Sequence, residues 1–152
     1  MFLHGKKSRG YRFLQEALIL LFLFGYVRRT QRGHVFHSAT KKIESKLLHV
    51  ALRNVQPILE VRKVRVAGKT FLVPSYVSKK RSFRLAIQWI LEAAKLSLKN
   101  QKKRILKSKF QHSIAIEIAL ALQKKGGPRK KREKLHQLAD ANRSFHHYRW
   151  WN

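Results

Sequence analysis

Along most of the chain, apolar residues recur every three to four positions, which is the spacing that predicts an amphipathic helix. The first such stripe spans residues 9–24. Ser8 is suited to cap the start of this helix, and Gly25 is suited to follow its end. Residues 28–37 are basic and polar and contain a glycine, so we expect a loop there.

The same spacing predicts four further helices. The first of these begins after Thr40 and is stopped by Pro57, because proline cannot continue a helix. Ser82 opens the next one, and Gly126-Gly127-Pro128 ends the one after it. The four stripes consist of Ile43, Leu47, Val50 and Ala51; Phe83, Ile87, Ile90, Leu91, Ala94 and Leu98; Ile114, Ile118, Ala121 and Leu122; and Leu135, Leu138, Ala139, Asn142 and Phe145.

Between Pro57 and Ser82 the period changes to two. Apolar and polar residues alternate on both sides of Gly68, which predicts a β-hairpin over about residues 61–77. Pro74 restricts the second strand to an edge or an end of a sheet. A hairpin alone is marginally stable, so this one should lean on the helices at its base. We therefore predict a mainly α fold, a single-domain helical bundle over residues 1–152 with one projecting β-hairpin.

The net charge of the chain indicates what kind of partner it binds. Thirty-five Lys and Arg residues face seven Asp and Glu residues, which gives a net charge of +28, although 44% of the residues are hydrophobic. A compact chain of this charge repels itself and needs a polyanion, and nucleic acid is the leading candidate. Residues 17–24 are strongly apolar but far too few to span a membrane, for which about 20 residues are needed. We expect no membrane partner.

The composition argues against an enzyme. The acidic residues are scattered singly, and the chain has no glycine-rich phosphate loop, nucleophile elbow or carboxylate pair. Cysteine is absent, and the adjacent His146 and His147 cannot both lie on one helical face. We therefore expect no catalytic residue, no metal site and no cofactor.

Basic residues gather in four clusters, two of which are placed at predicted helix starts. Free backbone N–H groups at a helix start also favour anions. The hairpin cluster is expected on one face of a projection that reaches toward RNA. The clusters are Lys79, Lys80, Arg81 and Arg84; residues 99–109; Lys124 and Lys125 with Arg129, Lys130, Lys131 and Arg132; and Arg62, Lys63, Arg65 and Lys69.

The C-terminal residues are aromatic, and two interpretations stay open for them. Arg149 lies between Tyr148 and Trp150, so the aromatic rings are placed to stack on splayed bases. Alternatively, Tyr148 and Trp150 close the core at the end of the bundle.

Several long motifs resemble one known family. These are Ala51–Pro57, Glu60-Val61, Val66–Gly68, Val73-Pro74, Ala86–Ala94, Lys131–His136 and Ala141–Trp150, with Gly5–Ser8 near the start. In this order they resemble the small-subunit ribosomal protein seven family of bacteria and organelles. The resemblance implies a helical bundle with a hairpin, binding to the 3′ major domain of small-subunit ribosomal RNA, and a role in assembling the head of the subunit. It also implies that the hairpin lies near exit-site transfer RNA and messenger RNA, beside neighbouring small-subunit proteins.

Carried over by position, the resemblance places Lys63, Arg65 and Lys69 toward the exit site. Together with the cluster analysis it gives an RNA-binding set. This set is Lys6, Lys7, Arg62, Lys63, Arg65, Lys69, Lys79, Lys80, Arg81, Arg84, Arg129, Lys130, Lys131, Arg132, Arg143, Arg149 and Trp150.

The chain departs from the family pattern at its ends. It begins inside the expected first helix of the family, without a basic N-terminal arm, and it ends just after Trp151, as mitochondrial members do. A short chain without a targeting segment fits a protein made within an organelle, so we expect a mitochondrial ribosome, with a plastid or the bacterial cytoplasm as alternatives. The rival functional interpretation is a free-standing basic architectural protein that binds nucleic acid.

Overall fold

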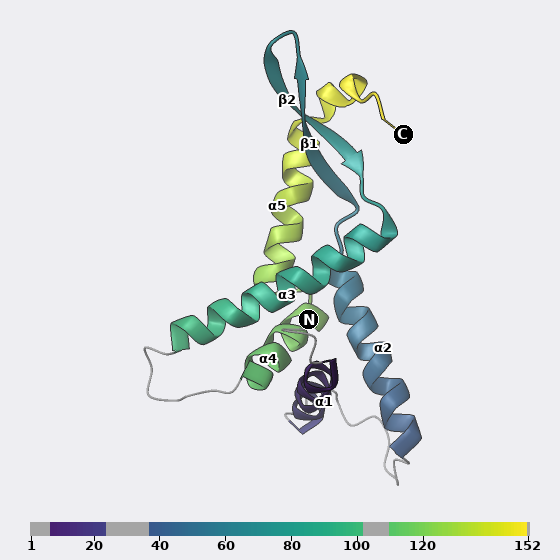
Figure 1. Ribbon diagram of the computed structural model, residues 1–152, viewed down its shortest axis with the longest axis vertical. Coiled ribbons are helices and arrows are strands. Elements are labelled where there is room, and N and C mark those ends of the chain that lie inside the picture. Colours follow the sequence, from purple (N-terminus) through teal and green to yellow (C-terminus); the bar gives the residue numbers. More distant parts are fainter. Residues whose placement is uncertain (1–6, 24–36, 102–109, 152) are drawn as a thin grey trace.

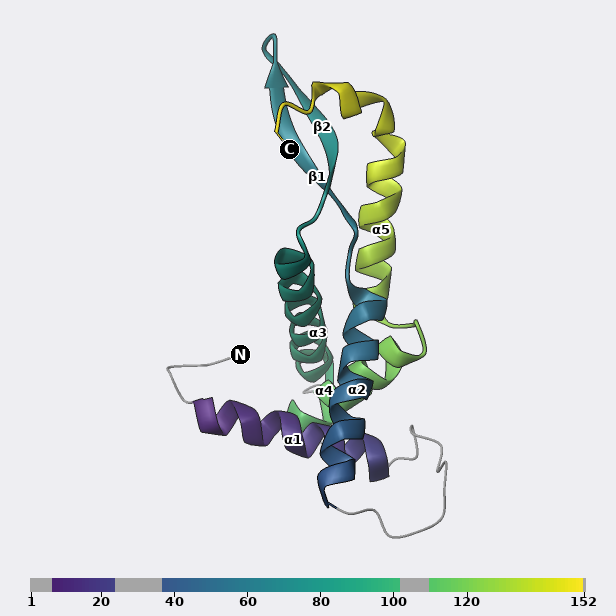
Figure 2. The same cartoon turned by 90° about the vertical axis from the view of Figure 1, so that its right-hand side faces the viewer.

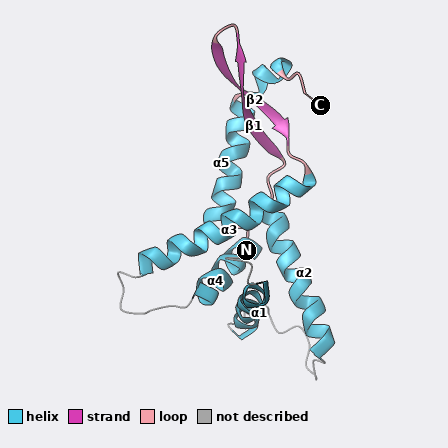
Figure 3. Ribbon diagram, in the orientation of Figure 1, coloured by secondary structure: helices cyan, strands magenta, loops and turns pink. Residues whose placement is uncertain are grey.

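The computed structural model describes residues 7–23, 37–101 and 110–151 (Figures 1 and 3). This part of the chain is mainly α with one β-hairpin, which confirms the predicted fold class. The elements are α1 (Lys7–Leu23), α2 (His37–Val55), β1 (Leu59–Val66), β2 (Lys69–Tyr76), α3 (Lys79–Gln101), α4 (Phe110–Leu122), α5 (Gly127–Ala141) and the 3-10 helix η2 (Arg143–Tyr148).

The core of the bundle is built around α4, which packs against α1, α2 and α3. Helix α4 is apolar on most of its surface, and its small residues let the neighbouring helices approach closely. Its buried residues Ile114 and Ile118 meet Leu21 of α1 and Val55 of α2 in a single cluster of buried side chains. Helix α4 therefore holds together elements that are far apart in the sequence.

The observed helices start earlier than the apolar stripes predict. Helix α1 begins at Lys7, so Ser8 lies inside it and is not its cap, and α2 begins at His37, before Thr40. Periodicity marks only the packed part of a helix, and the backbone extends beyond it. Gly25 and nearly all of the predicted loop 28–37 lie outside the described residues, as do residues 102–109 of the basic connector. Among the residues whose burial the structure describes, four in the predicted stripes are exposed: Tyr11, Val50, Phe83 and Leu138.

Helix α3 begins at Lys79, so the prediction that Ser82 opens it is wrong. Ser82 lies in the first turn, and its backbone N–H donates to the Ser78 carbonyl as in a regular helix. Its buried hydroxyl donates to the carbonyl of Pro57 over 2.7 Å. This bond ties the start of α3 to the segment that follows α2.

Helix α4 ends at Leu122 through a residue that the sequence pattern does not single out. Lys124 has a φ of 58°, and the N–H groups of Lys124 and Lys125 donate to the carbonyls of Ala121 and Leu120. These two bonds form a Schellman motif, in which glycine usually occupies the left-handed position. The predicted stop, Gly126, instead precedes α5 with a φ of 92°.

The hairpin is antiparallel, with Val66 paired to Lys69 and Leu59 paired to Tyr76. Its two-residue turn, Ala67-Gly68, has positive φ at both positions, as a type I′ turn requires. Among the described residues the sheet consists of β1 and β2, so Pro74 in β2 lies in an edge strand, as predicted.

The C-terminal segment supports the hairpin well beyond its base. Figure 2 shows α5 rising beside the strands, and the chain then turns across them. The α-helix ends at Ala141 and not beyond Phe145, and η2 follows it. The ring of Phe71 lies 5.2 Å from that of Phe145 and 4.9 Å from that of Tyr148. Tyr148 thus packs on the hairpin rather than closing the helical core.

Within the described ranges, no helix combines the length and the apolar character that a membrane crossing requires. In α1, Ala17, Leu18 and Leu21 are buried in the core, as expected for the apolar stretch that begins there.

Candidate nucleic-acid interface

The hairpin returns the chain to the place where it left the bundle. The backbone N–H of Val77 donates to the carbonyl of Ile58 over 2.9 Å, so the two ends of the hairpin meet. The last turn of α2 and the first turn of α3 consequently lie on either side of one junction. Basic residues that are separated by the whole hairpin in the sequence become neighbours there.

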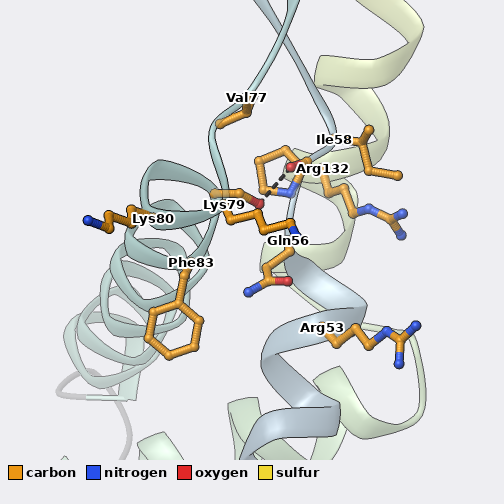
Figure 4. A pocket seen from close by; sticks show the side chains of 10 residues that line it. Arg53, Gln56, Ile58, Val77, Lys79, Lys80, Phe83 and Arg132 are labelled. Atoms are coloured by element: carbon orange, nitrogen blue, oxygen red, sulfur yellow. Dashed lines mark hydrogen bonds between the residues drawn. The ribbon is translucent and has the colours of Figure 1, made fainter.

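A groove with a volume of about 750 Å³ opens at this junction (Figure 4). Four of its lining residues are basic, and none of those that the structure describes is acidic. The lining residues are Arg53, Gln56, Pro57, Ile58, Val77, Lys79, Lys80, Ser82, Phe83 and Arg132. The partial positive charge at the N-terminus of α3 adds to the positive potential, and no acidic residue in the first turn of α3 offsets it. The groove is therefore a concave, electropositive site.

The groove brings together Lys79, Lys80 and Arg132, which the sequence analysis assigned to two different clusters. It adds Arg53, Gln56 and Phe83, which the analysis did not assign to a site. The position of Arg53 in the sequence could have predicted its place in the groove, because the residues on either side of a hairpin must lie close together in space. Arg53 lies six residues before the first residue of the hairpin, and Lys79 lies three residues after its last.

Arg129 is used by the fold itself. Its guanidinium donates to the carbonyl of Asn54 in the last turn of α2 over 2.8 Å, and its Nε lies 2.7 Å from the carboxylate of Glu133. Arg132 also donates to the Asn54 carbonyl, over 3.3 Å. The side-chain amide of Asn54 in turn donates to the carbonyls of Ala121 and Leu122 at the end of α4. Two helix C-termini and the start of α5 are thus joined through Asn54.

Arg132 serves both this junction and the groove. Its pKa is lowered, first by burial and then by the nearby charge of Arg129, while Glu133 opposes the shift. Its Nε is buried without a hydrogen-bond partner among the described residues. Guanidinium groups stay charged in proteins, so Arg132 presents a fixed positive charge beside the groove.

Glu60 at the base of β1 holds two predicted RNA-binding residues in place. Its side chain is only 9% exposed, and its two carboxylate oxygens accept from Arg62 over 2.9 Å and from Arg81 over 2.7 Å. Arg62 also lies over the ring of Trp151, with 5.3 Å between the guanidinium carbon and the ring centroid. Glu60 therefore fixes the hairpin to the first turn of α3.

The four basic residues of the hairpin do not share one face, contrary to the prediction. The register places Arg62 opposite Val73 and Lys69 opposite Val66, on the face that also carries Phe71. Lys63 and Arg65 lie on the other face, because successive strand residues point to opposite sides. Lys63 and Arg65 are both exposed.

The remaining predicted residues lie in several places. Lys131 is paired with Glu92 over 2.7 Å. Arg143 and Arg149 line a second cavity of about 200 Å³ between the hairpin and the C-terminal segment, together with Asp140. Exposed positions are held by Arg84, Lys130 and Trp150. Lys6 is outside the described residues, and Lys7 is the first residue of α1.

In the part of the chain that the structure describes, no three His, Asp or Glu side chains are grouped so that they could hold a metal ion. Glu117 has a raised pKa because it is partly buried, and its Oε2 is buried without a hydrogen-bond partner among the described atoms.

Comparison with known proteins identifies the family. The profile of the family described as ribosomal protein S7p/S5e matches residues 1–143. The chain belongs to the ribosomal protein S7p/S5e family.

Individual relatives come from plant mitochondria and from bacteria. The small ribosomal subunit protein uS7m of Marchantia polymorpha is 50% identical over 108 residues, which are 70% of this chain but 44% of that protein. The uS7m protein of Arabidopsis thaliana is 45% identical, with 76% of each chain covered. The uS7 protein of Syntrophobacter fumaroxidans is 37% identical over 89% of this chain and 88% of its own. The chain thus spans less than half the length of the Marchantia relative.

Membership of the S7p/S5e family confirms the resemblance seen in the sequence motifs. The relatives are named as small ribosomal subunit proteins and not as enzymes, in agreement with the expectation for this chain. These relatives include both mitochondrial and bacterial proteins.

His136 gives this S7p/S5e member a pH-sensitive link between α5 and the hairpin. Its Nε2 accepts a hydrogen bond from the backbone N–H of Ile58 over 3.1 Å. Burial lowers its pKa, followed by the charges of Arg132 and Arg129, while Asp140 opposes the shift. The folded state therefore favours neutral His136, the form that can accept this bond.

We expect the free energy of unfolding to fall as the pH drops below about 6.5, the ordinary histidine pKa, because the unfolded chain takes up the proton more readily. Gln at position 136 offers an oxygen acceptor that does not titrate. Between about pH 7.5 and about pH 5.5, the free energy of unfolding of His136→Gln should therefore decrease less than that of the wild type. His136→Ala should be less stable than the wild type by about 1 kcal/mol at neutral pH, because the hydrogen bond to Ile58 is lost. Urea denaturation at both pH values measures this. Equal acid sensitivity of wild type and His136→Gln would contradict the assignment.

Proposed function

We propose that the chain is a structural constituent of a small ribosomal subunit that binds the 3′ major domain of its RNA and helps to assemble the head. Family membership supports this proposal, and the groove between α2 and α3 is the observation that carries it. Four basic residues line the groove, and none of its described lining residues is acidic, so it suits the phosphates of a polyanion. In this role residues 1–152 act as one RNA-binding domain without a cofactor.

The proposed mechanism is electrostatic clamping of folded RNA. Each phosphate that meets a Lys or Arg side chain releases condensed counterions, which favours binding at low salt. The groove cations are carried by three helices joined through the Asn54 junction and the Ser82 bond, so their spacing is fixed before RNA arrives. A preformed arrangement lowers the conformational entropy that binding must overcome. Recognition should follow mainly the shape of the RNA backbone.

The hairpin is proposed to approach exit-site transfer RNA and messenger RNA. Lys63 and Arg65 are exposed on the face opposite the one that packs on the C-terminal rings. They are therefore available to phosphates beyond the RNA that the groove holds. We propose the mitochondrial ribosome as the location, because mitochondrial proteins are among the relatives that match.

Titration of the full chain with fragments of small-subunit ribosomal RNA and with duplex DNA, in raised salt, tests this function. We expect the 3′ major domain fragment to bind at least tenfold more tightly than a DNA duplex of equal length, because the groove is matched to a folded RNA and not only to charge. Equal affinity for both would favour a free-standing architectural protein instead.

A further inference from the structure

The groove exposes apolar surface that phosphate binding does not require. Phe83 is 40% exposed and Ile58 is 58% exposed, and both line the groove with Pro57 and Val77. Basic residues alone would serve to bind an RNA backbone. Large apolar side chains that stay exposed between charged ones indicate a ligand with both apolar and anionic parts.

We propose that the groove holds an unpaired RNA nucleotide, with its base against the ring of Phe83 and the flanking phosphates against Arg53, Lys79 and Arg132. This inference rests on the proposed function, which it makes more specific. A nucleotide splayed out of a helix offers a flat apolar face together with negative charge on either side. Stacking of such bases on aromatic rings is the usual way in which proteins bind single-stranded RNA.

The arrangement of the side chains fits this ligand. In Figure 4 the amide of Gln56 and the ring of Phe83 lie on one side of the groove, and the guanidinium groups of Arg53 and Arg132 extend toward the other side. The Gln56 amide can both donate and accept hydrogen bonds, as the edges of all four bases require. A base stacked on Phe83 therefore has the guanidinium groups of Arg53 and Arg132 across the groove from it, where they can meet its phosphates.

A paired RNA helix does not satisfy the same surface. The bases of an A-form helix are stacked on one another, so their faces cannot stack on an aromatic ring of the protein. A purely apolar peptide would leave four basic residues without counter-charges. An unpaired nucleotide satisfies both parts of the groove, which is why we choose it over these occupants.

The test compares a uridine-rich single-stranded RNA with a duplex RNA of equal length, both titrated against the full chain in raised salt. Phe83→Leu should weaken single-strand binding by about tenfold, in the range observed when a base loses its aromatic partner. Duplex binding should change less than about twofold. Phe83→Tyr, which keeps a ring, should restore single-strand binding. Tyr11→Leu is the matched control, since Tyr11 is an exposed aromatic residue on α1, outside the lining of the groove.

Each outcome separates the nucleotide site from the proposed function. If Lys79→Gln with Lys80→Gln weakens both RNAs but Phe83→Leu weakens neither, the nucleotide site is wrong and RNA binding stands. If none of these variants weakens either RNA, both proposals are wrong. A peptide rich in Glu and Leu gives the third outcome. If Phe83→Leu weakens binding of this peptide but not binding of single-stranded RNA, the groove is a peptide site and the proposal is overturned.

Discussion

Replacing Arg53, Lys79 and Lys80 together by Gln should weaken binding of the 3′ major domain RNA by about a hundredfold at physiological salt. All three side chains line the groove, and their loss removes about three phosphate contacts. Each contact contributes about −0.7 to −0.9 to the slope of log K against log salt, so the magnitude of this negative slope should decrease by about 2 to 3. Titrations at several salt concentrations measure both quantities.

A matched variant separates the groove from the total charge. Lys46, Lys95 and Lys134 are exposed lysines on α2, α3 and α5 outside the groove lining, and replacing them by Gln removes the same number of charges. Lys95 lies about 24 Å along the helix from Lys79. We expect this variant to lose less than about fivefold in affinity, through the general field alone. Equal losses in the two variants would show that RNA binding is spread over the surface.

Arg129→Ala should lower the free energy of unfolding by about 2 kcal/mol, in the range for hydrogen bonds to charged groups. The side chain is only 21% exposed, and its guanidinium satisfies the Asn54 carbonyl at the end of α2. Its removal leaves that carbonyl with the longer bond from Arg132 alone. Urea denaturation at constant ionic strength gives this value.

Lys130 is the control for this stability effect, because it is adjacent in sequence, carries the same charge and is exposed. Lys130→Ala should change stability by less than about 0.5 kcal/mol. If both substitutions have the same small effect, the Asn54 junction does not stabilise the fold. A loss of RNA binding in an Arg129 variant therefore has to be corrected for lost folded protein.

The elements could be predicted because their packed faces are periodic, whereas their boundaries depend on contacts that periodicity does not contain. The start of α3 shows this clearly. Ser82 is a good cap residue by type, but its hydroxyl binds the Pro57 carbonyl, and the helix begins at Lys79 instead. The end of α4 at Lys124 is similar, since a Schellman motif formed there without glycine.

The candidate site could be predicted only in part, because it depends on which distant segments meet. The lysines at the start of α3 were found from their clustering, and strand alternation alone could have divided the hairpin cations between two faces. The hydrogen bond from Arg129 to the carbonyl of Asn54 was not predictable, because it depends on where that carbonyl lies after folding. The packing of Phe145 on Phe71 likewise joins segments that only the folded chain brings together.

Sedimentation of the native protein tests the central claim most directly. A cell lysate or a mitochondrial extract would be separated on a sucrose gradient that contains magnesium and physiological salt. An antibody would then detect the protein in each fraction. The account predicts that the protein travels with the small ribosomal subunit and moves to the top of the gradient after the RNA is digested. Protein found at the top before any digestion, while intact small subunits sediment normally, would contradict it.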